Sequence, residues 1–395
     1  MIGALSHIRI LDFTQMVQGP LATQMLGDLG ADVIKVEMPQ SGDWLRHFSQ
    51  QELYMRGESA SFLAFNRNKR SLTLHLKKPE AREIITRLAR TSDVVVENFR
   101  PGVMDKLGLS YQFFSDVNPR LIYCSASGFG SSGPYVKRPG QDLLIQAMTG
   151  IPSLTGREDD PPVPMGVSLA DQYGAMHIVY AILAALLWRE QSGLGQKVET
   201  NLFNSLIALQ IQELTVQLNS GCFFHRSAEN HGHAAVGAPF GIYQTLDSYI
   251  AIAMMPVPRL TSLIDGDPVL LQYDTPEKAF AHRDEIKRLL EKTFVRRRTA
   301  EWLEVLDAHD VWCAPVQNHE QLARDPQALH NHIFTTYEHP TAGTVRTVNI
   351  PITLEKTPGQ IRRPAPRIGE HTDEILQEIN FSAGEIALLH RNKVI

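Results

Sequence analysis

The first third of the chain alternates short apolar segments with amphipathic ones. Helices are expected over Leu21–Leu29, whose apolar residues share one face, and over Pro79–Arg90, because proline favours the first helical position. Strands that alternate with helices predict an α/β fold with a mostly parallel sheet, whose ligands bind beyond the carboxyl ends of the strands. The expected strands are Ile8–Phe13, Asp32–Glu37, Arg70–Leu76, Val94–Val96 and Leu121–Ala126.

The strongest apolar run extends from Ile178 to Trp188, where every residue is apolar. A helix that is apolar on all sides is expected to lie in the core, and this run is shorter than the roughly 18 residues that a membrane span needs. Asp171 precedes it, in the first turn or at the cap of the expected helix. The helix dipole there favours the carboxylate form. Two roles remain open for Asp171, an N-cap or a nucleophile.

The second half of the chain changes character near Gly221, where a segment rich in Gly, Ala and His predicts a linker. A strand over Tyr249–Met254 and helices over Glu277–Phe294 and Ala300–His309, the second capped by Thr299, predict a smaller α/β domain. From Thr344 the alternation of a strand returns, and two helices follow. The last of them starts at a capping box formed by Ser382 and Glu385. We therefore expect a large domain made of residues 1–215 and 340–395, with residues 216–339 inserted as a small domain.

Composition excludes some functions. Of 395 residues, 43% are hydrophobic and 21% charged, with a formal net charge of -5, so a nucleic-acid partner is not expected. The three cysteines are far apart and odd in number, which is typical of reduced thiols in a cytosolic enzyme. The N-terminal segment has no basic region followed by an apolar stretch. We expect a cytoplasmic protein with no membrane association.

Two local patterns are set aside. Residues 128–133, GFGSSG, match a dinucleotide-binding GxGxxG, but such a motif must open a helix, and Pro134 and Pro139 favour an extended loop instead. His225, His231 and His233 are close in sequence, yet no carboxylate or cysteine stands at a familiar metal-ligand spacing. We expect no metal site, and a turn or lid role for these histidines.

Seven blocks in order carry a family resemblance. They are LDFTQMVQGPLATQMLGDLGADVIKVEMPQSGDWLR, NKRSLTLHLK, VVVENFRPGVMDKLGL, NPRLIYCSASGFGSSGP, the segment around Asp171, SGLGQKVETNL and IGEHTDEIL. The chain resembles class III CoA-transferases, which include formyl-CoA and carnitine CoA-transferases and, as a side branch, α-methylacyl-CoA racemase. The resemblance implies a Rossmann-like large domain and a small domain in an open ring, with two chains interlocked as a homodimer. It implies acyl-CoA and a small carboxylic acid as substrates and no permanently bound cofactor.

The same resemblance gives Asp171 the role of nucleophile on the acyl-CoA thioester. A mixed anhydride and then an aspartyl-CoA thioester are the implied intermediates. Gln18 matches a glutamine near the carbonyl under attack, where an amide donor stabilises a developing oxyanion. An ordinary loop role for Gln18 stays open.

Further positions are carried over from the family as contacts to coenzyme A. Lys106 stands where relatives have an arginine, so it keeps the charge and loses the two-pronged contact. Met38 departs from the family arginine, and the glycine-rich lid of formyl-CoA transferases is not evident among Gly232, Gly237 and Gly241. Surface roles for Lys77 and Lys106 stay open. The implied coenzyme A contacts are Val17, Gly19, Leu74, Lys77, Asn98, Phe99, Arg100, Gly102 and Lys106.

Two alternatives to CoA transfer are kept. A racemase needs a base on each face of the substrate carbon, and racemases carry a histidine where this chain has Gln141, whose amide exchanges no proton at neutral pH. Asp142 then remains as a second acidic group of the substrate site, or as a cap of the helix that follows it. The other alternative is a CoA-binding protein with a degenerate site. The sequence does not select the acids, and we expect short-chain or dicarboxylic ones.

Overall fold

The computed structural model describes residues 3–395, which divide into two compact units. Of the described residues, the first contains 3–145, 168–209 and 327–395, and the second contains 146–167 and 210–326. This division differs from the expected one in three respects. Residues 146–167 and residues 210–215 belong to the second unit, and the return to the first unit comes at residue 327, earlier than residue 340.

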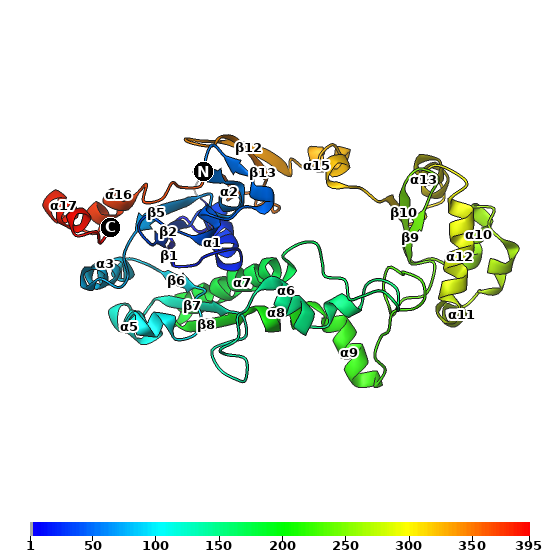
Figure 1. The fold of residues 1–395 in the computed structure, drawn as a ribbon, viewed down its shortest axis with the longest axis horizontal. Coiled ribbons are helices and arrows are strands. Elements are labelled where there is room, and N and C mark those ends of the chain that lie inside the picture. The colour runs from blue at the N-terminus through cyan, green and yellow to red at the C-terminus, as the bar shows by residue number, and fades with distance from the viewer. Residues whose placement is uncertain (1–2) are drawn as a thin grey trace. The chain divides into compact units, whose positions relative to one another are not determined.

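A six-stranded parallel sheet forms the centre of the first unit (Figure 1). Its order is β5-β2-β1-β6-β7-β8, which is the doubly wound order of a Rossmann-like sheet. The predicted parallel α/β architecture is therefore confirmed. The strands are β1 (Arg9–Asp12), β2 (Asp32–Glu37), β5 (Lys69–Thr73), β6 (Val94–Glu97), β7 (Ile122–Ser127) and β8 (Lys197–Asn201).

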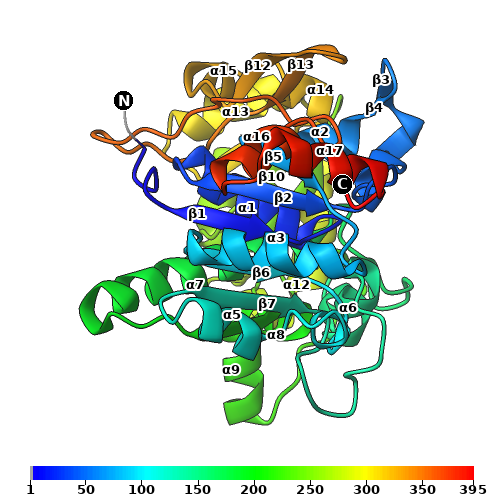
Figure 2. The same ribbon diagram turned by 90° about the vertical axis from the view of Figure 1, so that its left-hand side faces the viewer.

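Each face of this sheet is covered by helices, because alternate strand residues point to opposite sides. Leu11, Ile34 and Val95 pack on one face against helices α3, α5, α16 and α17. Ile10 and Val33 pack on the other against α1 and α7; Figure 2 shows α3 and α5 in front of the strands. The helices are α1 (Gln18–Asp28), α3 (Pro79–Arg90), α5 (Tyr111–Val117), α7 (Leu169–Ser192), α16 (Thr372–Glu378) and α17 (Ala383–Arg391).

Helix α7 is not buried all round, which corrects the expectation from its apolar sequence. Ile178 and Ile182 are fully buried against the sheet, whereas Tyr180, Leu187 and Trp188 are 59%, 70% and 52% exposed. Within residues 3–395 it is the one helix long and apolar enough to cross a membrane by length and composition alone. Packing of its buried face against the sheet accounts for much of that apolar character.

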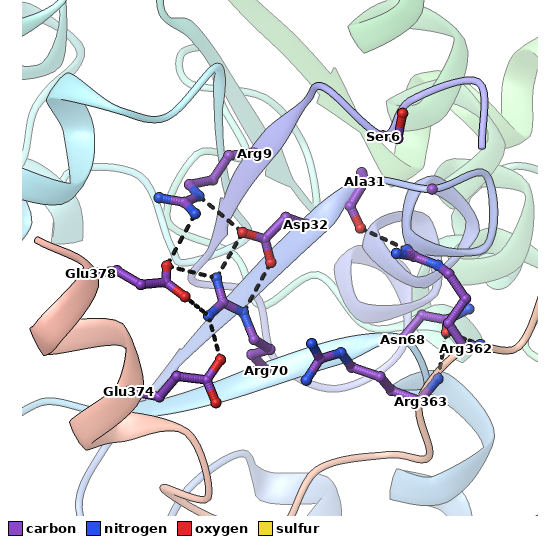
Figure 3. Close-up of a pocket in the computed structure, with 11 residues that line it drawn as sticks. Ser6, Arg9, Ala31, Asp32, Asn68, Arg70, Arg362, Arg363, Glu374 and Glu378 are labelled. Atoms are coloured by element: carbon purple, nitrogen blue, oxygen red, sulfur yellow. Dashed lines mark hydrogen bonds and ion pairs between the residues drawn. The ribbon is translucent and has the colours of Figure 1, made fainter. Parts of the chain in front are cut away.

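The C-terminal segment is bound to the start of the sheet by ion pairs (Figure 3). Arg70, at the beginning of β5, donates to Asp32 at 2.7 and 3.0 Å and to Glu378 of α16 at 2.6 Å. Arg9 donates to the same two carboxylates at 2.9 and 3.1 Å. Burial raises the pKa of Asp32, but Arg70 and Arg9 outweigh it and hold the value below the usual range. The predicted capping box of α17 is present, because Ser382 and Glu385 bond each other's backbone N–H.

The remaining elements of the first unit are short. They are β3 (Tyr54–Met55), β4 (Glu58–Ser59), α2 (Ala60–Phe65), α4 (Val103–Lys106), α8 (Leu202–Leu209), β12 (Phe334–His339) and β13 (Gly343–Val348). The strand predicted from Thr344 is β13, which pairs with β12 in an antiparallel hairpin, and β12 was not expected. Helices α6 (Asp142–Met148) and α15 (Pro326–His330) lie across the boundaries between the units.

The second unit packs helices against a three-stranded antiparallel sheet of order β11-β10-β9. The helix expected over 277–294 is broken at His282 into α11 and α12. The predicted cap of α13 is also wrong, because Thr299 is its first residue and both its N–H and its hydroxyl donate to Asp247. The elements are α9 (Ile211–Ser220), β9 (Gly241–Gln244), β10 (Tyr249–Ile252), α10 (Val257–Leu263), α11 (Pro276–Ala281), α12 (Arg283–Phe294), α13 (Thr299–Asp307), β11 (Cys313–Pro315) and α14 (His319–Leu322).

Candidate active site

The loops after β1 and β6 meet at the carboxyl edge of the sheet, on either side of the point where the strand order reverses. Asn98 donates its amide N–H to the carbonyl of Gln15 at 2.8 Å and accepts the Gln15 N–H at 2.9 Å. Ligands of open α/β sheets bind at this reversal point. Asn98 therefore fixes the backbone of the loop after β1 at this edge.

Asp171 lies in the first turn of α7, as predicted, but it does not cap the helix. Asp142 does, since its Oδ1 accepts the backbone N–H of Ala170 at 2.7 Å and of Asp171 at 3.2 Å. Asp142, the first residue of α6, thus caps the start of α7. The Asp171 carboxylate accepts no hydrogen bond from residues 3–395 and is partly exposed. The predicted N-cap role of Asp171 is therefore not observed, and its partly exposed carboxylate is left without a hydrogen bond by the described residues.

The charge state of Asp171 differs from the expectation that the helix N-terminus keeps it ionised. Burial and then the nearby Asp142 charge raise its pKa to about 7. The helix dipole does not outweigh desolvation and the carboxylate of Asp142, which bonds the same turn from α6. A carboxyl group that titrates near neutral pH is a candidate functional group.

Gln18 is the first residue of α1 and is 4% exposed. Its amide Nε2 is buried and has no hydrogen-bond partner among the described residues. It lies against Gly174 of α7, where an added Cβ would stand 2.7 Å from that nitrogen. Gly174 is one turn beyond Asp171 on the same helix face. A buried donor without an acceptor is uncommon in folded proteins, and this one lies beside the turn that carries Asp171.

The other residues predicted to contact coenzyme A differ in how buried they are. Gly19 is buried, and a Cβ there would stand 2.3 Å from that of Thr14, so this glycine permits the close turn before α1. Leu74 is 1% exposed within the core, so its side chain does not fit the predicted adenine contact. Phe99 also packs against the core, whereas Val17 is half-buried at the start of α1. Met38 is 39% exposed beyond β2 and brings no charge to this edge.

A basic cavity of about 360 Å³ lies beside the end of β5. Lys77 and Lys106 line it together with Lys78 and Arg82, and no acidic residue does. Lys78 donates to the carbonyl of Asn392 at 2.8 Å and Arg82 to that of Gly108 at 3.0 Å. Lys77 and Lys106 are exposed and have no partner within residues 3–395. The two lysines predicted to bind phosphate are thus the two that the fold leaves free.

A second cavity, of about 160 Å³, follows the ends of β6, β7 and β8. Arg100 and Gly102 of the predicted ENFRPG loop line it, and Gly102 adopts a left-handed conformation with φ 82° to begin α4. Burial raises the pKa of Glu97 in the same cavity, where Ser125 donates a hydrogen bond to its carboxylate. The Arg100–Gly102 part of this loop therefore borders the second cavity, whereas the basic cavity is lined from Lys106 onward.

The patterns set aside from the sequence have structural roles. Residues 128–141 form a loop with no helix, as predicted, but the loop is not extended, because residues 134–137 form a turn and Gly128 and Gly140 touch at its base. Gln141 is exposed at the end of this loop, directly before Asp142. His231 contacts Asp284 and His233 contacts Glu213, at 3.0 and 3.1 Å. No group of three or more potential metal ligands occurs within residues 3–395.

The glycines considered for a lid are packing positions in the second unit. A Cβ on Gly232 would stand 2.8 Å from the Phe240 ring, and one on Gly237 would stand 2.9 Å from the Phe280 N–H nitrogen. Gly241 begins β9. These close approaches explain the lack of a side chain at Gly232 and Gly237, whereas a Cβ on Gly241 would make only an ordinary contact, at 3.7 Å.

Comparison with known proteins agrees with this geometry. The family model for CoA-transferase family III matches residues 5–372. The chain is 35% identical to a formyl-CoA:oxalate CoA-transferase of Streptomyces avermitilis, with 100% of each chain covered. It is 32% identical to the human succinyl-CoA:glutarate CoA-transferase, covering 96% of this chain and 86% of that protein.

The fold has a close counterpart among solved structures. A CaiB/BaiF family protein from Brucella suis superposes with a TM-score of 0.84 at 31% sequence identity, covering 96% of this chain and 100% of the other. The six-stranded parallel sheet, the whole-chain match and the named relatives point to one class of enzyme acting on CoA thioesters. This protein belongs to CoA-transferase family III.

Proposed function

We propose that this CoA-transferase moves CoA between short-chain or dicarboxylic acids through a covalent intermediate on Asp171. The relatives named for succinyl-CoA and glutarate, and for formyl-CoA and oxalate, support acids of this size. One observation carries the proposal. The partly exposed Asp171 carboxylate, which does not cap the helix, and the buried Gln18 amide nitrogen, which has no partner among the described residues, lie beside the same turn of α7.

The exchange proceeds in four balanced steps. The Asp171 carboxylate attacks the thioester carbonyl, and CoA leaves as a thiolate from the new mixed anhydride. The thiolate attacks the Asp171 carbonyl, which releases the donor acid and leaves an aspartyl-CoA thioester. The acceptor carboxylate displaces CoA to form a second anhydride, and the thiolate then attacks the acceptor carbonyl. Acceptor-CoA leaves, and the Asp171 carboxylate is restored.

Two features support the first step. The Gln18 amide donates to the oxygen that becomes negative as the tetrahedral centre forms, a type of contact that typically contributes 10²–10³ in rate. Lys77, Lys106 and Arg100 supply positive charge for the phosphates of coenzyme A at the same edge of the sheet. Together they allow the thioester to be held while Asp171 attacks it.

Self-association is part of the proposal. Helix α7 exposes Met176, Tyr180, Leu187 and Trp188, an apolar surface unusual for a monomer in water. We propose that a second copy covers it in the interlocked homodimer that the family resemblance implies. We also propose a cytoplasmic location, since Cys124, Cys222 and Cys313 are free thiols.

The intermediate can be trapped chemically. After incubation with an acyl-CoA and then hydroxylamine, we expect the peptide that contains Asp171 to carry a hydroxamate, detected by peptide mass spectrometry. Controls without acyl-CoA, and with Asp171→Ala, should remain unlabelled. Absence of label from that peptide, or label on Asp142 instead, would contradict the covalent role of Asp171.

The racemase alternative is tested in the same preparation. A racemase would exchange the α-proton of a 2-substituted acyl-CoA with heavy water, whereas the transferase leaves it in place. We expect no deuterium in the recovered substrate, because the exposed Gln141 offers no base.

A further inference from the structure

Two fully buried charges hold the loop that leads into α1. Lys35, on β2, lies with its Nζ 2.8 Å from Asp43 Oδ2, and both side chains are at most 1% exposed. The same Nζ donates to the carbonyl of Thr14 at 2.8 Å. Asp43 Oδ1 accepts the backbone N–H of Met16 at 3.1 Å and of Leu45 at 3.0 Å. The ion pair thus bonds the loop at two of its residues.

The loop needs such support because its backbone is strained. Met16 has φ 67°, in the left-handed region that residues with a side chain rarely adopt. Its N–H is bound by Asp43, and the preceding Gln15 is bound on both sides by Asn98. A strained residue persists when its surroundings over-determine it, and such residues cluster at functional sites.

The strained residue determines where Gln18 begins α1. Only Val17 separates Met16 from Gln18, and Val17 has no side-chain cap bond of its own. The amide nitrogen of Gln18 lies against Gly174 of α7 and has no acceptor among residues 3–395. A shift of the loop would move this donor away from the turn that carries Asp171.

A role in stability alone is a weak explanation for this ion pair. Removing two charges from water costs more than most buried pairs regain, and apolar residues of similar size often replace them without loss. Lys35 and Asp43 instead bond the backbone of one particular loop. Asp43 also donates its own N–H to Glu37 at 3.0 Å, which fixes its position after β2.

We propose that Lys35 and Asp43 are positioning residues, which act through the Thr14–Val17 loop to place the Gln18 amide for catalysis. The inference rests on the proposed role of Gln18 in stabilising the oxyanion. It adds two residues, neither of which touches the substrate, to the groups that determine the rate of the first step.

A double-mutant cycle tests this inference in the full-length enzyme. The first change is Lys35→Met with Asp43→Leu, which replaces the charges by apolar groups of similar size. We expect kcat to fall about tenfold, because small displacements of catalytic groups have effects of this order or larger. KM for the acyl-CoA should change less than about twofold, because Lys77 and Lys106 are untouched.

The second change is Gln18→Ala, which we expect to lower kcat about 100-fold. If the ion pair acts through Gln18, adding Lys35→Met and Asp43→Leu to Gln18→Ala should lower kcat by less than about twofold more. An equal tenfold loss in both backgrounds would overturn the positioning role. No loss from Gln18→Ala alone would instead overturn the proposed oxyanion role, so the two failures are distinguishable.

The matched control is another buried ion pair of the same unit, Arg67–Asp28, with a separation of 2.8 Å and 5% exposure of each side chain. It bonds Asn68 and the carbonyl of Val348 and does not contact the loop. Arg67→Met with Asp28→Leu should leave kcat within about twofold. If the Lys35 and Asp43 variant does not fold, Asp43→Asn is carried through the same cycle with the same criterion.

Discussion

The two edges of the parallel sheet differ in how completely their polar groups are paired. At the amino edge Arg9, Asp32, Arg70 and Glu378 neutralise one another, with distances of 2.6–3.2 Å between their charged atoms. At the carboxyl edge the Gln18 amide has no partner, and the Asp171 carboxylate accepts no hydrogen bond within residues 3–395. The same strands thus begin in a network of ion pairs, whereas their carboxyl edge combines the paired Lys35 and Asp43 with two polar groups that have no partner among the described residues.

The two edges differ in whether their polar groups have hydrogen-bond partners, more than in how many polar groups they hold. A guanidinium that fills its donors, as Arg70 does, holds α16 on the sheet. A buried donor without an acceptor costs about 1–3 kcal/mol of folding free energy when nothing satisfies it. The unpartnered groups therefore lie at the carboxyl edge, where open α/β sheets bind their ligands.

The largest expected effect removes the nucleophile. Asp171→Ala should lower kcat by about 10⁴-fold or more, because no other carboxylate can trade acyl partners at that position. Its unfolding midpoint in urea should not fall, since the side chain makes no hydrogen bond to lose. Steady-state transfer between an acyl-CoA and an acid, read by mass spectrometry, gives the rate.

At the amino edge, the corresponding substitution is Asp32→Ala, which should lower stability and leave kcat nearly unchanged. Asp32→Ala leaves Arg70 and Arg9 without a shared carboxylate, and should cost about 1–3 kcal/mol of unfolding free energy. Its kcat per folded molecule should stay within about twofold. Loss of turnover in Asp32→Ala, or normal turnover in Asp171→Ala, would erase the distinction between the two edges.

The second effect is the pH dependence of the carboxyl edge. Because the pKa of Asp171 is raised to about 7, the nucleophilic form is lost as pH falls, and kcat/KM should drop about tenfold per pH unit below 7. Asp142→Asn keeps an oxygen for the α7 cap but removes the charge, so the midpoint should move to lower pH by about one unit. An unmoved midpoint would show that another group titrates.

The raised pKa of Asp171 also makes the stability of the fold depend on pH. Stability should fall as pH rises, whereas a salt-bridged acid would make it rise. The folded protein holds a proton on Asp171 that the unfolded chain releases above its ordinary value of 3.8, so this contribution is complete below about 4 and is lost as pH rises through 7. At pH 8, Asp171→Asn should be more stable than wild type by about 1–2 kcal/mol, and at pH 4 equal to it. Urea titrations at both values measure the difference.

Much of the first unit could be predicted from the sequence, since local patterns dictate it. The segments Asp32–Glu37 and Pro79–Arg90 have the predicted bounds, because periodicity and an N-terminal proline are local signals. The Asp171 helix was located by its apolar run, but its exposed face was not. A sequence shows that a face is apolar and does not show what covers it.

The candidate site was predictable in its residues and less so in their partners. Asp171 and Gln18 were found through the family resemblance, but the cap on α7 comes from Asp142, 29 residues earlier in the chain. The Lys35–Asp43 pair was missed, because a lysine in a strand is ordinarily read as an exposed residue. Such long-range pairings depend on tertiary packing. A lysine within an otherwise apolar buried strand, Asp32–Glu37, was the signal available.

The smallest expected effect sharpens the comparison at the basic cavity. Lys77 and Lys106 are free at the carboxyl edge, whereas Lys78 and Arg82 in the same lining are bound to backbone carbonyls. If the free pair binds the phosphates of coenzyme A, Lys77→Ala and Lys106→Ala should each raise KM for the acyl-CoA about three- to fivefold, with kcat unchanged.

Ionic strength and an arginine substitution complete this test. The increase in KM should shrink in high salt, because exposed charges are screened. Lys106→Arg should lower KM below wild type, since a guanidinium adds a two-pronged phosphate contact. The exposed Lys292 of α12, which has no partner within residues 3–395, is the matched control, and Lys292→Ala should leave KM unchanged. Equal effects of the Lys77, Lys106 and Lys292 variants would mean that net charge alone attracts the substrate, and that the unpartnered lysines of the carboxyl edge form no phosphate site.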